Sequence, residues 1–450
     1  QLWVSLLLLP LDTSILIGVS LLGRIRFFHN KDRHHRRNVL RNPRFYPKTI
    51  LITGVGTARG LALARQFHYG GHRVIGADVG LTPIRSGGSM SKAVHCCYSI
   101  SKTQYVCNLL DIINREKVDI WVPFLDRATP LEDGVAKSTI ESRTSCKCVH
   151  FNVDSVTIFS RDDLFLQHVG EKGLSVFERH NVKSRDSVHR ILNGSPSKNY
   201  VIHTTIKGAI HDAVLLPRRT PSQTYSDVSE LQITKDHPWV LQQRARLGSY
   251  WADFLLIQGC VKAMKIRYSS QTSGWQESSL NSSIHEVTRQ LMERFADKGK
   301  SQMSGHLSVK FMVDEEIKRN TVCYTVYLAG CRQGTAVSRL LDDPPPNLFT
   351  CYLEILPTTA DSANETAPES FEKRAKPIWP VVAAEKTTRG IERFTYPIET
   401  INLMSHKLGL SDIWNRSRFS SIDPLPWWWH LHISQPLNDL VLMVNGSTET

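Results

Sequence analysis

The first part of the chain alternates between short apolar runs and stretches with apolar residues at helical spacing. The run at 50–52 leads through a glycine-rich turn into an amphipathic helix and then a second strand that ends at Asp78. Further along, a helical pattern precedes a short buried strand at 120–124, and residues 149–153 form another apolar run. Strands that alternate with helices predict a parallel sheet with right-handed crossovers. Residues 48–153 are therefore predicted to form an α/β module with a parallel sheet.

From residue 154 the pattern changes to that of an α+β domain. The predicted helices lie at 162–171 and 285–296, and the predicted strands at 200–204, 239–243, 253–257, 261–267, 306–313 and 322–328. A turn at Gln258 and Gly259 joins two of these strands into a hairpin. The polar residues 314–320 are predicted to form the turn between the last two strands. Three consecutive prolines end this α+β region, which covers residues 154–345.

Residues 346–450 are predicted to be a Pro- and Ser/Thr-rich linker followed by a Trp- and Pro-rich region. The three consecutive tryptophans at 427–429 lie beside prolines. Indole rings favour the boundary between lipid headgroups and water, so these residues could lie at a membrane interface. Alternatively, they pack on the body of the protein in an irregular subdomain. The sequence leaves both interpretations open.

The N-terminal segment, residues 1–23, contains the apolar stretch LWVSLLLLPLDTSILIGVSLL, close to the ~20 residues that cross a bilayer. Pro10 and Asp12 oppose a spanning helix, since a carboxylate near the membrane centre is costly. We expect a membrane-associated protein with a cytoplasmic body, its N-terminal segment either spanning the bilayer or lying at its interface. A buried helix in a soluble cytoplasmic protein is the alternative. Because the sequence begins with Gln1, we also consider it a possible fragment.

The positive charge of the chain is concentrated beside this segment. The net charge is +13, of which +8 lies in residues 24–48, a segment that includes the predicted basic linker at 24–47. The remainder is spread thinly, so a basic surface for nucleic acid is not indicated. The apolar content of 41% is ordinary for a globular protein. Nine cysteines without any CxxC pair predict neither a zinc site nor a disulfide framework.

The glycine-rich turn LITGVGTARG is a candidate phosphate-binding loop. Gly54, Gly56 and Gly60 would let the backbone approach a phosphate at a helix N-terminus, and Asp78 could hold a ribose. This pattern is typical of NAD(P)-dependent oxidoreductases, which are one alternative for the chain. A turn that packs the helix on the strand without binding a nucleotide is the interpretation we favour, because a lone glycine signature has low specificity.

Four stretches in this order resemble the ATP-grasp superfamily, specifically the carbamoyl-phosphate-synthase-like carboxylate–amine ligases of fungal secondary metabolism. They are ILITGVGTARGLALARQFHYGGHRVIGAD, VDIWVPFLDRATPLEDGVAK, HPWVLQQRARLGSYWADFLLIQGCVKAM, and GHLSVKFMVDE together with VYLAGCRQGTAVSRLL. The resemblance covers about residues 48–341. It implies a Rossmann-like pre-ATP-grasp module followed by a two-lobed ATP-grasp module.

The resemblance also implies an activity and its cofactors. Such ligases use ATP and Mg²⁺ to convert a small-molecule carboxylate into an acyl phosphate, which an amine then attacks. On this sequence, the resemblance assigns Gln242 and Gln243 to the adenine, and His203 stands where a phosphate-binding lysine is expected. Arg332 is the residue it retains for stabilising the acyl phosphate, because a guanidinium matches phosphate geometry.

The residues that should bind the metal ion are missing. Lys310 stands where the family has its first metal-binding acid, and Leu328 and Gly330 replace the Glu and Asn of the last strand. Residues 326–337 contain no Glu, Asp or Asn, so a shift of the alignment would not restore them. We therefore predict no metal ligands. The resemblance thus implies an ATP-dependent carboxylate–amine ligase or, given this loss, a catalytically impaired relative. A non-catalytic membrane-tethered scaffold is an alternative.

Overall fold

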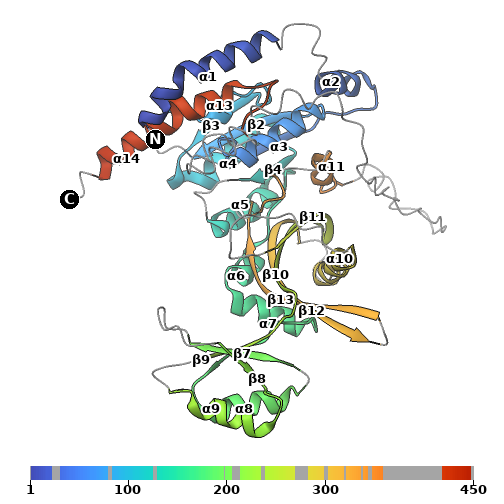
Figure 1. The fold of residues 1–450 in the computed structure, drawn as a ribbon. Helices are drawn as coiled ribbons and strands as arrows, with labels where there is room; N and C mark the ends of the chain where they lie inside the picture. Colours follow the sequence, from blue (N-terminus) through green and yellow to red (C-terminus); the bar gives the residue numbers. More distant parts are fainter. Residues whose placement is uncertain are drawn as a thin grey trace, which may run out of the picture. The chain divides into compact units, whose positions relative to one another are not determined.

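The computed structural model describes most of the chain in thirteen stretches: residues 2–22, 31–79, 84–124, 129–196, 198–204, 213–234, 239–268, 282–297, 303–318, 321–335, 338–342, 347–357 and 418–446. The chain forms two compact units (Figure 1). The first combines residues 1–149 with 341–450, and the second consists of residues 150–340.

The first unit contains a five-stranded parallel sheet in the order β3-β2-β1-β4-β5. Its strands are β1 (Thr49–Thr53), β2 (Arg73–Val79), β3 (Cys96–Ile100), β4 (Ile120–Pro123) and β5 (Lys147–Cys148). Its helices are α1 (Leu2–Leu22), α2 (Lys31–Arg41), α3 (Ala58–Tyr69), η1 (Gly87–Met90), η2 (Lys102–Gln104), α4 (Tyr105–Glu116), α5 (Pro130–Arg143), α11 (Leu348–Leu353), α13 (Leu425–Trp429), η4 (His430–Ser434) and α14 (Gln435–Gly446). This mixed α/β fold with a parallel sheet agrees with the prediction. The last strand lies at β5, earlier than the predicted run at 149–153.

The glycine turn between β1 and α3 is packed by protein atoms. Thr57 caps α3 by accepting a hydrogen bond from the Gly60 N–H. The Asp78 carboxylate accepts hydrogen bonds from the Gly56 N–H and from the hydroxyl of Ser86. A Cβ atom at Gly56 would lie 2.7 Å from the Cβ of Ser86, so the glycine permits this close approach. Both the turn and Asp78 therefore have structural partners.

The C-terminal segment docks on the first unit through a buried ion pair. The Arg65 guanidinium donates to the Asp423 carboxylate at 3.2 Å, and the two side chains are only 8% and 2% exposed. The predicted tryptophan cluster also packs on protein, since Trp427 is buried and the Trp428 indole donates to the hydroxyl of Thr13. These contacts agree with packing on the body, but the segment is helical rather than irregular.

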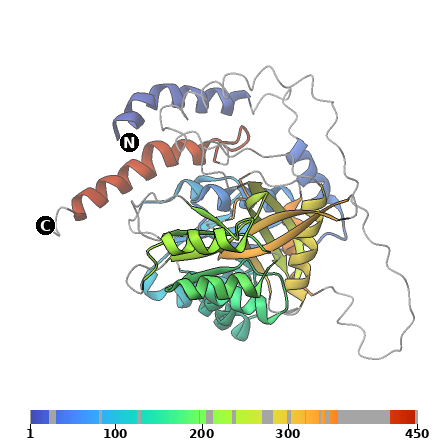
Figure 2. The same ribbon diagram turned by 60° about the horizontal axis from the view of Figure 1, so that its bottom comes forward.

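Helix α1 lies beside the C-terminal helices in both Figure 1 and Figure 2. Asp12 and His432 join them, with 3.0 Å between a carboxylate oxygen and Nε2 and with both side chains buried. Burial raises the pKa of Asp12, and the neighbouring His432 opposes this effect. In the described part of the chain, no helix combines the length and the apolar character needed to cross a membrane. The structure therefore does not support the predicted transmembrane helix, and the carboxylate that opposed it has a partner within the protein.

The second unit contains two four-stranded antiparallel sheets, in the orders β11-β10-β12-β13 and β6-β9-β7-β8. Its strands are β6 (Arg179–Val182), β7 (Tyr200–Thr204), β8 (Val214–Leu216), β9 (Trp239–Gln243), β10 (Gly248–Ile257), β11 (Cys260–Tyr268), β12 (Gly305–Lys318) and β13 (Thr321–Gln333). Its helices are α6 (Val153–Phe159), α7 (Asp162–Glu171), α8 (Arg185–Gly194), α9 (Pro221–Glu230) and α10 (Ser282–Asp297). Helices α6, α7 and α10 share a core with the larger sheet, and α8 contributes to the core of the smaller one.

Two hairpins in this unit bear on the sequence predictions. Gln258 and Gly259 have φ values of 51° and 77°, the left-handed conformation that a two-residue hairpin turn requires. The predicted turn at 314–320 was wrong over 314–318, because these residues continue β12 and pair with β13. Residues 319 and 320 lie outside the described residues. The polar composition of residues 314–318 suggested a turn. In the structure these residues form the outer end of a long antiparallel hairpin, which needs no apolar core there.

Candidate functional site

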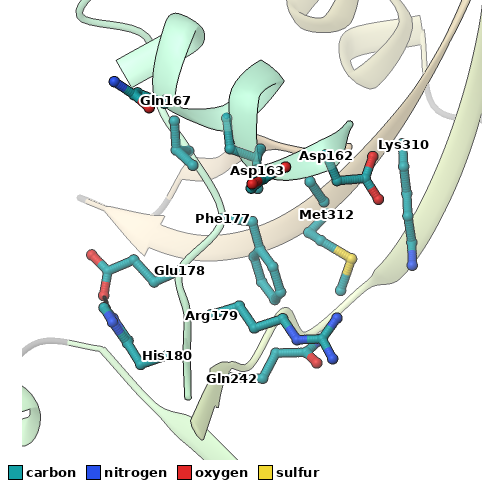
Figure 3. A pocket seen from close by; sticks show the side chains of 13 residues that line it. Asp162, Asp163, Gln167, Phe177, Glu178, Arg179, His180, Gln242, Lys310 and Met312 are labelled. Atoms are coloured by element: carbon teal, nitrogen blue, oxygen red, sulfur yellow. Dashed lines mark hydrogen bonds and ion pairs between the residues drawn. The ribbon is translucent and has the colours of Figure 1, made fainter. Parts of the chain in front are cut away.

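A pocket of about 600 Å³ lies within the second unit (Figure 3). It is formed by α7 and the segment that follows it, by β6 and β9 of the smaller sheet, and by β12 and β13 of the larger sheet. The lining residues are Asp162, Asp163, Leu166, Gln167, Val176, Phe177, Glu178, Arg179, His180, Gln242, Lys310, Met312 and Ala329. This volume suits a small-molecule ligand of nucleotide size.

The smaller sheet presents one polar face on the side of the pocket. Arg179 on β6 is paired with Gln242 on β9, so both side chains lie on the same face of the sheet. His203 on β7 belongs to this face as well, because it lies two residues beyond Val201, the other partner of Gln242. His203 does not itself line the pocket. Partial burial, and secondly the charge of Arg179, lower the pKa of His203, which favours its neutral form at pH 7.

Gln243 lies on the opposite face of β9. It is only 4% exposed, and its side-chain oxygen accepts a hydrogen bond from the backbone N–H of Glu178 at 3.3 Å. The resemblance assigned both glutamines to an adenine. The structure places Gln242 in the pocket lining, whereas Gln243 is buried and bonds the backbone beside β6.

The larger sheet presents a cationic face on its side of the pocket. Lys310 is paired with Trp251 on β10, and Trp251 is paired in turn with Arg267 on β11. The guanidinium carbon of Arg332 lies 5.2 Å from the centre of the Trp251 ring, and that of Arg267 lies at 5.9 Å. The fully buried Asp253 accepts hydrogen bonds from Arg267 and Ser308. Arg332 thus lies over a tryptophan on the same face as Lys310, outside the pocket lining.

The acidic residues of the pocket already have partners. Asp162 accepts a hydrogen bond from the Cys331 N–H at 3.1 Å and holds β13 against α7. Asp163 pairs with Arg161 on the surface. Glu178 accepts hydrogen bonds from Lys198, at 2.5 Å, and from the hydroxyl of Tyr200. Although partial burial opposes ionisation of Glu178, these bonds lower its pKa.

These residues do not fit a magnesium ion. Mg²⁺ is usually bound through one or more carboxylates that can turn toward it. Within the stretches that the structure describes, no group of three or more His, Cys, Asp or Glu side chains could hold a metal ion. Lys310 on β12 would repel a cation in the pocket. On β13, Leu328 belongs to the buried core, and Gly330 packs against Asp162.

The sequence did not predict several residues of the pocket, notably Arg179 and its neighbours on β6. The stretch Arg-His-Asn-Val has neither alternation nor a run of apolar residues, and only Val182 is fully buried. Its strand depends on pairing with β9, whose residues lie about sixty positions later. Asp162 was predicted at the start of a helix, which is correct, but its contact with β13 has no local signal.

No protein-family model matches the sequence, and no curated protein matches it either. Several solved structures are similar to the chain. The N5-carboxyaminoimidazole synthetase from Staphylococcus aureus is 10% identical, and the match covers 65% of this chain and 72% of that one with a TM-score of 0.39. The biotin carboxylase subunit of pyruvate carboxylase is also 10% identical, covering 65% and 66% with a TM-score of 0.45. The L-amino acid ligase from Bacillus licheniformis is 12% identical, covering 66% and 70% with a TM-score of 0.37.

At identities of 10–12% and TM-scores below 0.5, this likeness carries no argument about the family, the substrate or the reaction of this chain.

Proposed function

We propose that this chain is a catalytically impaired relative of the ATP-grasp carboxylate–amine ligases. Residues 48–153 would correspond to the pre-ATP-grasp module and residues 154–345 to the two-lobed ATP-grasp module. The parallel sheet of the first unit and the two antiparallel sheets around a pocket in the second unit support this assignment.

The observation that carries the proposal is the charge of the pocket. A working ligase must stabilise the transfer of a phosphoryl group to a carboxylate, which is mainly a matter of position and of neutralising negative charge. Here Lys310 lies where a metal-binding acid is expected, and the acids of the pocket are engaged by Lys198, Arg161 and the backbone of β13. The metal-assisted route is therefore lost, while the fold is kept.

The test is to incubate the purified chain with ATP, Mg²⁺ and a panel of carboxylic acids and amines, and to measure release of phosphate and formation of amide. We expect no turnover above the protein-free background. Magnesium-dependent release of phosphate that requires both an acid and an amine would show that the ligase is active and would overturn the proposal. Arg332→Gln is the informative variant in that case, since an active ligase would depend on this guanidinium.

A nicotinamide oxidoreductase is the less favoured alternative. It would need the glycine turn and Asp78 to bind a dinucleotide, whereas Asp78 accepts hydrogen bonds from Gly56 and Ser86, and the Arg418 guanidinium donates to the Gly56 carbonyl. An increase of NADH fluorescence that disappears in Asp78→Asn would favour this alternative. A non-catalytic scaffold instead predicts no effect of any nucleotide on thermal unfolding.

A further inference from the structure

Two cations of the pocket have no acidic partner among the residues described. Arg179 extends from β6 and Lys310 from β12, so each of the two sheets contributes one of them (Figure 3). All three acids that line the same pocket have other partners, as described above for Asp162, Asp163 and Glu178. Asp163 and Glu178 pair with cations, whereas Asp162 accepts a backbone N–H and keeps its charge. The two cations therefore outnumber this one carboxylate, and the pocket keeps an excess of positive charge for an anion that comes from solution.

The surroundings of Lys310 strengthen this bias. On the same face of the larger sheet, Arg332 lies over Trp251, and Arg267 is held by the buried Asp253. Lys310, Arg267 and Arg332 thus lie on one face of this sheet, where the carboxylate of Asp253 pairs with Arg267. Such an arrangement attracts anions and excludes divalent cations, and its effect is larger in a partly enclosed site than on an open surface.

The uncharged residues of the pocket indicate what kind of anion fits. The Gln242 amide, which offers both a donor and an acceptor, lies beside Arg179 on the same face. Phe177 and Met312 add apolar surface on which a planar ring could rest. A ligand with a flat, hydrogen-bonding ring at one end and phosphate groups at the other matches this combination, and about 600 Å³ is sufficient for it.

We infer that this pocket binds a nucleoside polyphosphate without a metal ion, with Lys310 and Arg179 neutralising the phosphate groups that Mg²⁺ would otherwise neutralise. The inference rests on the proposed loss of the metal site and adds a retained binding activity to it. Ammonium and guanidinium groups bind phosphate oxygens through charge-assisted hydrogen bonds and need no coordination geometry. Magnesium competes with these side chains for the same oxygens, so it weakens binding.

The test is calorimetric titration of the full chain with ATP and ADP, once in EDTA and once in excess Mg²⁺. We expect binding in EDTA and at least a threefold weaker affinity for ATP in Mg²⁺. Lys310→Gln and Arg179→Gln should each weaken binding in EDTA by tenfold or more, and Lys310→Arg should retain most of it. Lys183→Gln and Arg190→Gln are matched controls, because both are exposed positions outside the pocket in the same unit, and they should change the affinity less than twofold. Unchanged thermal unfolding of each variant excludes misfolding as the cause of lost binding.

The outcomes separate this inference from the proposed function. Binding of ATP only in the presence of Mg²⁺ would overturn both. Absence of binding in EDTA and in Mg²⁺ alike would overturn the inference and leave the impaired ligase in place. Binding that is as sensitive to the two control substitutions as to those at Lys310 and Arg179 would place the ligand elsewhere and also overturn it. Inorganic tripolyphosphate that binds as tightly as ATP would refute a role for the nucleoside.

Discussion

The carboxyl group of Asp133 should make the stability of the first unit strongly dependent on pH. Asp133 lies on α5, is 5% exposed and accepts a hydrogen bond from the Tyr105 hydroxyl at 2.7 Å. Burial raises its pKa to about 7, although the Tyr105 hydrogen bond opposes the shift. The folded unit therefore retains a proton that the unfolded chain has lost above pH 4. Stability is fully present below the unfolded pKa of 3.8 and is lost as the pH rises through 7.

The size of the effect follows from these two values. Each pKa unit corresponds to ~1.4 kcal/mol, so ionised Asp133 costs the folded unit about 4 kcal/mol above pH 8. About 3 kcal/mol of this is lost between pH 5 and pH 8. Asp133→Asn keeps the shape and the acceptor for Tyr105 but carries no charge. We expect the variant to gain stability over the natural chain as the pH rises, which corresponds to roughly 6–12 °C in melting temperature across that interval.

The assay must report on the first unit alone, because the two units need not unfold together. Urea unfolding followed by brief proteolysis and peptide mapping of α5 and β4 meets this requirement at pH 5, 6.5 and 8. Asp111→Asn, an exposed aspartate on the adjacent α4, is the matched control and should shift the curves equally at each pH. If Asp133→Asn and the natural chain keep a constant difference from pH 5 to pH 8, Asp133 does not titrate as argued and the reasoning is wrong.

Three further predictions concern packing and the N-terminal segment. Asp423→Ala leaves Arg65 buried without its carboxylate and should lower the free energy of unfolding in urea by about 3–5 kcal/mol. Asp342→Ala, at the more exposed ion pair with Arg59, is the control and should lower it by less than ~1 kcal/mol. Equal losses for the two variants would contradict this prediction. Phe311→Ala, in the core of the larger sheet, should cost about 3–5 kcal/mol by the same measurement, and a cost near zero would mean that the core is misassigned. Membrane association of the N-terminal segment stays a prediction. We expect the intact chain to sediment with anionic vesicles and a chain without residues 1–48 to remain in the supernatant; an intact chain that stays in solution would refute it.

Local patterns predicted the regular elements of the fold well. The bounds of α7, β7 and β9 agree with their predicted ranges, because each element carries its signal within its own residues. Strand β6 and the outer half of β12 were missed for the opposite reason. Most of their residues are polar, and β9 and β13 supply the backbone partners that make them strands.

Long-range contacts account for the features that the sequence could not supply. Asp12 opposed the predicted membrane helix, but its partner His432 lies 420 residues away and gives no local signal. The partners of Asp162 and Glu178 are equally invisible, although each decides whether a carboxylate is available to a ligand. The sequence could show that residues 326–337 contain no acid and that position 310 is a lysine. It could not show that the acids remaining near the pocket are already bound.

The two faces of β12 serve different purposes. Side chains alternate along a strand, so Val309, Phe311 and Val313 lie in the core, whereas Lys310 and Met312 line the pocket. Substitutions on the pocket face leave the core packing intact, so they change the stability of the fold little. A structural likeness built on the core face therefore says little about activity. The pocket face of the same strand carries Lys310, and the proposed metal-free anion site depends on this face.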